Sequence, residues 1–228
     1  MGLSHGGKKM WCVPELNDEY IERMEDILNL YAREYYEKEP VICLDEKPIQ
    51  LLEDIRKPRV SNGKRFKIKK KDHQYKRKGT ANTFSCVEPL VGYYNFTVTK
   101  NKKGPEFAKV MNKLSKKYCK ADVIHIVMDN YCTHTQKALI NYYGEEKGKM
   151  IWNRFEVHYT PKNASWLDQA EIAIGLYSRQ CLGKGRIPDI DTLKNKTKAW
   201  NKAINKKKVK LHWGLTIEKA RKIFDYDK

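Results

Sequence analysis

The spacing of apolar residues changes its period near residue 100, and this change constrains the fold more than any other feature of the 228-residue sequence. Before it, an apolar run at 41–45 has the length of a strand, and residues 82–88 and 93–99 predict two strands joined in a hairpin. After it, helical stripes alternate with strand-length runs at 122–128 and 155–160. The order predicts a three-strand meander followed by right-handed parallel crossovers. We therefore expect an α/β fold with a mixed sheet flanked by helices.

Capping residues and helical periodicity place the helices between and around these strands. Asn17 can cap a helix that runs from Asp18 to about Lys38, and Thr133 with Gln136 has the pattern of a capping box. Four further helices are expected to begin near Gly104, Ser165, Asp191 and Thr216. We predict a flexible lead over residues 1–16 and one domain over 17–228, with the last helices at its carboxyl end. Residues 46–78 are expected to be mostly irregular, with a hairpin near Ser61–Gly63.

The charge of the chain favours a polyanionic partner. Lysine and arginine number 46 against 28 aspartates and glutamates, a formal net charge of +18, which suits phosphate contacts on nucleic acid. A lysine-rich proteome is the alternative explanation. No stretch reaches the roughly 20 apolar residues of a membrane helix, so no membrane partner is expected. The start has no apolar signal-peptide core, and no Cys-x-x-Cys pair occurs, so we expect a cytoplasmic protein with reduced cysteines.

The positive charge is clustered in two segments. Residues 61–78 hold a single acid, Asp72, and aromatic residues interleave with the basic ones, a pattern suited to gripping a nucleic-acid backbone. A second cluster at 194–210 contains eight lysines and no acid, and a solvated helix face explains it equally well. The candidate DNA-binding residues of the first cluster are Lys64, Arg65, Lys67, Lys69, Lys70, Lys71, Lys76, Arg77 and Lys78.

Three acids have the positions of a divalent-metal site. Asp45 and Asp129 end two predicted strands, where α/β sheets usually build their sites. Glu171 is expected on the buried stripe of its helix, where an acid is costly unless it is paired or binds a metal. A salt bridge to a lysine is the alternative for each acid taken singly. Two metals held by these oxygens could serve phosphodiester hydrolysis or transesterification, and the residues do not choose between a nuclease and a strand transferase.

Neighbouring polar residues have more than one interpretation. His134 follows Asp129 by five residues and could reach the metal site, or it could be a capping or packed histidine. Asn130 is a further auxiliary candidate, and Asp168 is interpreted as a helix cap. Glu46 follows Asp45 and should point to the other side of an extended chain. The histidines at 125 and 158 alternate with apolar residues and are interpreted as structural.

Four blocks of sequence also carry a family resemblance. They are Cys43–Gln50, Tyr75–Phe84, Val127–His134 and Val157–Glu171, supported by Ser178–Leu182 and Trp213–Arg221. Together they resemble the transposases of bacterial and archaeal insertion sequences in the Tc1/mariner superfamily, from about Trp11 to Phe224.

The resemblance implies a ribonuclease H-like fold and a DDE triad. By motif the triad falls on Asp45, Asp129 and Glu171, and His134 matches the family's histidine after the second acid. It further implies Mg²⁺ or Mn²⁺, two ions in number. The implied activity is cleavage of double-stranded DNA at transposon inverted repeats and strand transfer into target DNA. Relatives act in paired complexes, which makes a homodimer the expected assembly.

The chain departs from the family pattern at several positions. Asp168 stands where the family usually has asparagine, Lys78 replaces an asparagine, and Asn163-Ala164 replaces a common His-Gly. We expect no amino-terminal helix-turn-helix domain within these residues. Two other readings follow: a catalytically inactive or truncated DNA-binding remnant, and a host-recruited nuclease with a ribonuclease H-like fold.

Overall fold

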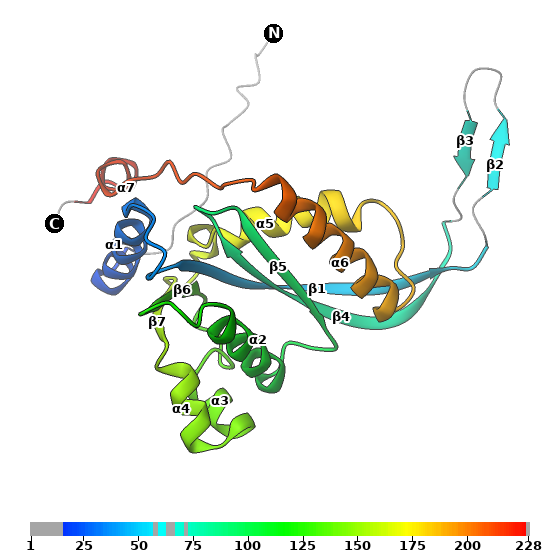
Figure 1. Ribbon diagram of the computed structural model, residues 1–228. Helices are drawn as coiled ribbons and strands as arrows, with labels where there is room; N and C mark the ends of the chain where they lie inside the picture. The colour runs from blue at the N-terminus through cyan, green and yellow to red at the C-terminus, as the bar shows by residue number, and fades with distance from the viewer. Residues whose placement is uncertain (1–15, 57–58, 63–66, 71–72, 227–228) are drawn as a thin grey trace, which may run out of the picture.

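A mixed five-stranded sheet forms the centre of the protein, in the order β5-β4-β1-β6-β7 (Figure 1). The computed structural model describes residues 16–56, 59–62, 67–70 and 73–226. The strands of the sheet are β1 (Val41–Asp54), β4 (Tyr75–Glu88), β5 (Tyr93–Thr99), β6 (Ile124–Met128) and β7 (Phe155–Tyr159). β1, β4 and β5 pair antiparallel, whereas β6 and β7 add in parallel. The predicted meander followed by parallel strands is therefore confirmed.

The first part of the sheet is longer than the sequence predicted. β1 continues to Asp54 and pairs with β4 as far as Tyr75, so both strands extend beyond the rest of the sheet as a two-stranded arm. The prediction of irregular structure from residue 46 was wrong here because Pro48 and the charged residues obscured the alternation. β6 pairs only with the first residues of β1, so Pro48 lies where one side of β1 is an edge and a proline is tolerated. The predicted hairpin is present as β2 (Arg59–Asn62) and β3 (Lys67–Lys70).

One face of the sheet is covered by α2 (Gly104–Lys117), α3 (Gln136–Tyr143) and α4 (Glu145–Trp152). The even-numbered residues Ile42 and Leu44 of β1 point into this layer and are fully buried. The predicted capping box was wrong: α3 begins at Gln136, Thr135 occupies the cap position, and the Thr133 hydroxyl forms no hydrogen bond. α4 was not predicted.

The other face carries α1 (Asp18–Ala32), α5 (Ala170–Tyr177), α6 (Ile190–Lys207) and α7 (Ile217–Phe224). Asn17 caps α1 as predicted, with Oδ1 accepting from the Tyr20 amide at 2.8 Å. Met24 and Ile27 are completely buried beneath α1, and burial of such a side chain stabilises by about 1.5–3 kcal/mol. α1 ends six residues before the predicted Lys38, because Arg33 already has an extended backbone. The predicted lead over 1–16 lies outside the described residues except for Leu16, which packs against the buried cluster that contains Met24 and Ile27.

The segment after β7 is more irregular than the single predicted helix. A 3₁₀ turn at Ser165–Leu167 precedes α5, and a π-helical turn at Ser178–Leu182 follows it. Asp168 therefore lies between the 3₁₀ turn and α5 and not inside a helix. This arrangement changes which side chains of α5 face the sheet.

α6 is tied to the outer strand of the sheet by two asparagine side chains. Asn205 accepts from the Tyr94 amide at 2.8 Å and donates to the Tyr94 carbonyl at 2.8 Å. Asn201 makes the same pair of bonds to Phe96, at 3.2 and 2.9 Å. The four-residue spacing on the helix matches the two-residue spacing on β5, so both amides meet the backbone of the strand.

Candidate active site

Strand register brings Asp45 and Asp129 together. The parallel ladder pairs Cys43 with Val127. Asp45 lies two residues after Cys43, and Asp129 lies two residues after Val127. Neighbouring strands lie about 4.8 Å apart, so the two carboxylates meet where the parallel ladder ends. Asp45 is not at the end of its strand as predicted, because β1 continues. It lies at the end of the β1–β6 pairing, which has the same consequence for the site.

Glu171 reaches the same site from the first turn of α5. It is exposed, so the prediction that it lies on the buried stripe was wrong; that stripe is formed by Ala170, Ala173, Ile174 and Tyr177. The helix begins later than predicted, which rotates Glu171 away from the core and toward the acids. Its negative charge contributes to the raised pKa of Asp45, which places the two carboxylates within electrostatic reach of each other.

Asp168 is buried beside the site, with 4% of its surface exposed. Its Oδ1 accepts from the Ala170 amide at 2.8 Å, so its predicted role as a cap is consistent with the structure. Burial, together with the charge of Asp45, raises the pKa of Asp168 well above its usual range. The uncharged carboxylic acid is thereby favoured, and it has the shape and the neutral charge of the asparagine that the sequence resemblance leads us to expect at this position.

His134 joins Asp129 to Glu46 beneath the site. Its Nδ1 lies 2.7 Å from Asp129 Oδ1, and its Nε2 lies 2.7 Å from Glu46 Oε1. The ring is 1% exposed and stacks on Phe107 at a centroid distance of 4.8 Å. Burial would lower the pKa of His134, but the hydrogen bonds to the two carboxylates raise it to about 10. His134 is therefore a charged bridge whose position fixes Asp129.

Sequence reasoning predicted that Glu46 points away from Asp45 but gave it no role. The even-numbered residues of β1 face α2 and α3, and Glu46 belongs to this set, so its side chain is 4% exposed and needs a partner. In the sequence, the position of Glu46 next to a candidate metal ligand and on the buried side of its strand could have indicated that it has a role in the site. Asp129 benefits from the same bridge: burial acts to raise its pKa, but the hydrogen bond from His134 lowers it below its ordinary value.

Asp45 has the opposite electrostatic environment. Burial raises its pKa to about 7, and the charges of Glu171, Glu46 and Asp129 act in the same direction, although the Glu46 amide donates to Asp45 Oδ1 at 2.7 Å. Within the residues that the structure describes, neither Asp45 nor Glu171 forms an ion pair with a basic side chain. The positive charge of His134 serves Asp129 and Glu46, whereas no bonded basic side chain offsets the repulsion between Asp45 and Glu171 in the described residues.

This repulsion predicts a stability effect. Because the pKa of Asp45 is raised from 3.8 to about 7, the folded state holds the proton more tightly than the unfolded state. Its ionisation therefore costs stability as the pH rises through this window. Asp45→Asn should stabilise the metal-free protein at pH 8 by on the order of 2 kcal/mol, allowing for solvent screening, and have little effect at pH 4. Urea unfolding in a chelator measures this difference; equal or lower stability of the variant at pH 8 would contradict it.

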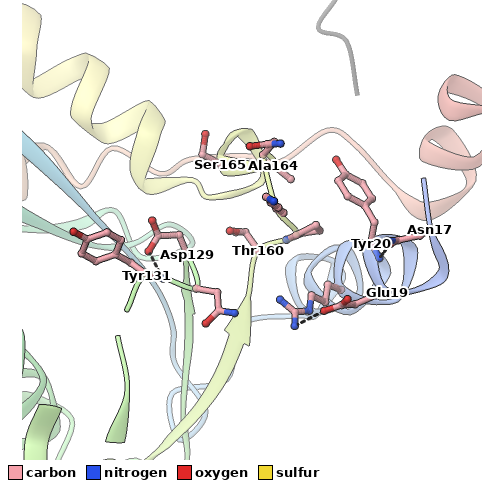
Figure 2. Close-up of a pocket in the computed structure, with 13 residues that line it drawn as sticks. Asn17, Glu19, Tyr20, Asp129, Tyr131, Thr160, Ala164 and Ser165 are labelled. Atoms are coloured by element: carbon pink, nitrogen blue, oxygen red, sulfur yellow. Dashed lines mark hydrogen bonds and ion pairs between the residues drawn. The ribbon is translucent and has the colours of Figure 1, made fainter. Parts of the chain in front are cut away.

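An open groove of about 810 Å³ borders the acids (Figure 2). It is bounded by the start of α1, the segment after β6 and the segment after β7. Asp129 and Asn130 line it, whereas Asp45 and Glu171 do not. Asn130 is exposed, and within the described residues its side chain forms no hydrogen bond with His134 or Glu46. The groove offers space for a long substrate that passes beside the acids.

The structure describes only some of the candidate DNA-binding residues. Lys64, Arg65 and Lys71 lie outside the described residues, and Lys67, Lys69 and Lys70 lie in β3, where only the backbone is described. The remaining three, Lys76, Arg77 and Lys78, are exposed on the β4 side of the arm. Lys78 forms a 3.3 Å ion pair with Glu53.

A family model for "DDE superfamily endonuclease" matches residues 40–194, more than half of the chain. The chain belongs to this family. The matched segment contains Asp45, Glu46, Asp129, Asp168 and Glu171, and it begins just before β1 and ends near the start of α6. No curated protein matches the chain.

The DDE fold of this protein is similar to solved structures of a transposase. "Mos1 transposase paired-end complex with left transposon end" has a TM-score of 0.55 and 16% identity, and covers 91% of this chain and 63% of that chain. "Crystal structure of the Mos1 mariner paired end complex with Mn" has a TM-score of 0.53 and 18% identity, with coverage of 91% and 63%. "Crystal structure of a pre-cleavage Mos1 transpososome" has a TM-score of 0.55 and 16% identity, with coverage of 91% and 64%.

These similarities confirm the ribonuclease H-like fold. The DDE chain spans less than two thirds of the length of the structures that it resembles. In the described part of this protein, no helix combines the length and the hydropathy that a bilayer crossing needs.

Proposed function

We propose that this protein is the catalytic domain of a transposase, a metal-dependent DNA endonuclease and strand transferase of the insertion-sequence branch of the Tc1/mariner superfamily. The observation that carries the proposal is the convergence of Asp45, Asp129 and Glu171 on one site of a ribonuclease H-like sheet, in a chain of the DDE endonuclease family. The domain would comprise residues 17–228.

The residues of the site fit Mg²⁺ or Mn²⁺. Both cations prefer oxygen ligands, and Asp45, Asp129 and Glu171 supply carboxylates without a competing basic side chain at Asp45. A cation would also offset the cost of burial and the repulsion between carboxylates, which together raise the pKa of Asp45. One of the similar structures is a complex "with Mn". We propose that these three residues hold two ions, which, when bound, activate a water or a 3′-hydroxyl and stabilise the leaving oxygen.

The protein itself contributes position and charge. His134 is held by Glu46 and by stacking on Phe107, and it orients the Asp129 carboxylate from behind. Asp168 fixes the start of α5 through its bond to the Ala170 amide, and this sets the position of Glu171 one residue later. Preorganised ligands of this kind reduce the cost of assembling the site for each turnover.

Double-stranded DNA is the proposed partner. The net charge of +18 favours it, and the similar structures include complexes with transposon ends. A duplex could lie in the groove beside Asp129. It could also lie against the basic arm, which is the extension of β1 and β4 that carries Lys76, Arg77 and Lys78. Two of the similar structures are paired-end complexes, and we propose a homodimer that holds two ends.

The proposal is tested by cleavage of transposon-end duplex DNA with Mg²⁺ or Mn²⁺, against a chelator control. The ends would be taken from the inverted repeats that flank the reading frame. A chain fused to a matching end-binding domain separates a failure of recognition from a failure of chemistry. No cleavage by either form would favour the inactive DNA-binding remnant. Cleavage of any duplex without strand transfer would favour the host-recruited nuclease.

The basic arm yields a salt-dependence prediction. If Lys76, Arg77 and Lys78 contact phosphates, replacing all three by glutamine should weaken DNA binding and reduce the log–log salt slope by roughly 0.9 for each lost contact. Affinity measured between 50 and 200 mM salt gives the slope. Glutamine at the exposed residues Lys116, Lys120 and Lys147, which lie outside both basic clusters, is the matched control for net charge. Equal slopes in the arm variant and the unmodified protein would identify the arm as a solvated surface.

A further inference from the structure

Two histidines and a glutamate gather on the sheet away from the candidate active site. In the β6–β7 ladder His125 pairs with Glu156, and His158 lies two residues farther along β7, so all three side chains lie on the same face. α1 covers this face, at the outer edge of the sheet (Figure 1). His125 precedes Asp129 by four residues, which is roughly 13 Å along an extended chain. The cluster is therefore separate from the acids.

The atoms of the cluster have the spacing of a metal site. One ligand atom from each residue lies within 4.8 Å of the other two. His125 Nδ1 and His158 Nε2 are 3.0 Å apart, and the Glu156 oxygens lie 3.7 and 4.0 Å from them. Two nitrogens bound to tetrahedral zinc at about 2.0–2.1 Å are separated by roughly 3.3 Å. A displacement of a few tenths of an ångström would therefore admit the ion.

The residues around the cluster are those that orient metal-binding histidines. His158 donates from Nδ1 to Asp26 Oδ2 of α1 at 2.6 Å, which leaves Nε2 with its lone pair directed at the cluster. On the other side, Glu39 Oε2 lies 3.7 Å from His125 Nε2, where it could pair with this nitrogen once the nitrogen carries a proton. A carboxylate is thus available behind each imidazole.

Without a metal, the same groups form a closed hydrogen-bond chain. Arg33 can only donate, and at 3.2 Å it requires His125 Nε2 to accept, so His125 donates from Nδ1 to His158. Metal binding would replace that one proton and move it to His125 Nε2, facing Glu39. Arg33 could then no longer donate to His125 Nε2 and would keep Glu39, now 3.8 Å away, as its partner. The histidines are 3% and 6% exposed, whereas the Glu156 side chain is 57% exposed, which leaves an entry route from solvent.

We propose that His125, His158 and Glu156 bind one zinc-class ion that fastens α1 to the outer edge of the sheet, with a water in the fourth position. Two imidazoles and one carboxylate suit Zn²⁺ and its first-row neighbours, whereas Mg²⁺ prefers an all-oxygen set such as the acids described above. The role is structural, because Asp26 connects the ligand His158 directly to α1.

The test is titration of the full chain with Zn²⁺, monitored by calorimetry and by thermal unfolding, with Co²⁺ absorption as a probe of tetrahedral coordination. We expect one ion per chain at this cluster, and at 100 times Kd the unfolding equilibrium constant should fall about 100-fold. Zn²⁺ can also bind carboxylates, so the measurements use the Asp45→Asn background, which should retain the cluster signal.

Three variants distinguish the cluster from other binding. Glu156→Gln changes an exposed side chain and should weaken binding at least tenfold without affecting the fold, and His158→Gln should abolish the tetrahedral Co²⁺ spectrum. His212→Asn, at an exposed histidine outside the cluster, is the matched control and should bind as the unmodified chain does. No saturable Zn²⁺ binding in the Asp45→Asn background, or binding that survives Glu156→Gln undiminished, would overturn the proposal.

Discussion

Replacing Asp45 by asparagine is expected to reduce metal-dependent DNA cleavage by at least about 10³-fold, or about 4 kcal/mol of transition-state stabilisation. The amide keeps the shape of the side chain and the bond from the Glu46 amide, but it removes the anionic oxygen that would hold the cation. Asp45 is a better target than Asp129, because Asp129 also bonds to His134 and its loss would disturb the fold. Initial rates with Mn²⁺ on end-containing duplexes measure the effect.

The control separates lost chemistry from lost structure. The Asp45→Asn chain should bind DNA with nearly unchanged affinity and should be more stable than the unmodified chain at pH 8, so unfolding cannot account for the inactivity. Asp191→Asn removes an exposed acid on α6 and should leave cleavage unchanged. An Asp45→Asn protein that keeps a tenth or more of the activity would exclude Asp45 from the metal site.

Replacing His134 by phenylalanine is expected to destabilise the protein by about 3–5 kcal/mol at pH 7, because it leaves the buried Glu46 carboxylate without its partner. Phenylalanine preserves the stacking on Phe107, so the loss reports the charge and not the packing. Urea unfolding with a chelator present gives the free energy. Adding Glu46→Gln to the variant should recover part of the loss, since it neutralises the stranded charge.

The same variant should change the pH dependence of stability. The pKa of His134 is raised to about 10 in the folded state, above its ordinary value of 6.5. Its protonated form therefore contributes stability that is complete below pH 6.5 and is lost as the pH rises toward 10. His134→Phe should lack this decline. Unfolding free energies that differ by less than 1 kcal/mol at pH 7, or a double variant no more stable than His134→Phe, would contradict a charged bridge.

Periodicity was sufficient for the order of the sheet and insufficient for the lengths of its parts. Within the predicted runs, residues 42–44 and 124–128 are buried on both faces of the sheet, and such runs have few alternative structures. The outer half of β1 contains charged residues and Pro48, and it is a strand because β4 pairs with it over its whole length. That pairing is a long-range contact, which a local pattern does not encode.

The candidate site could likewise be predicted only in part. Asp45, Asp129 and Glu171 could be proposed from their positions in the sequence, because strand ends and helix starts place side chains in a defined way. The exposure of Glu171 could not, since it depends on a 3₁₀ turn that shifts the start of α5. The charged bridge of His134 requires Glu46 from a strand 88 residues earlier, and only the folded sheet brings the two together.

The asparagine pairs of α6 bear on where this domain can be cut. A row of unpaired backbone amides and carbonyls on an outer strand is a template for pairing with another chain, and Asn201 and Asn205 occupy those groups on β5. The family match ends at residue 194, before either asparagine. A fragment that ends at that boundary would keep every acid of the site but would leave the backbone groups of β5 exposed and unpaired. α6 therefore protects the outer strand from self-association through side chains that lie beyond the segment matched by the family model.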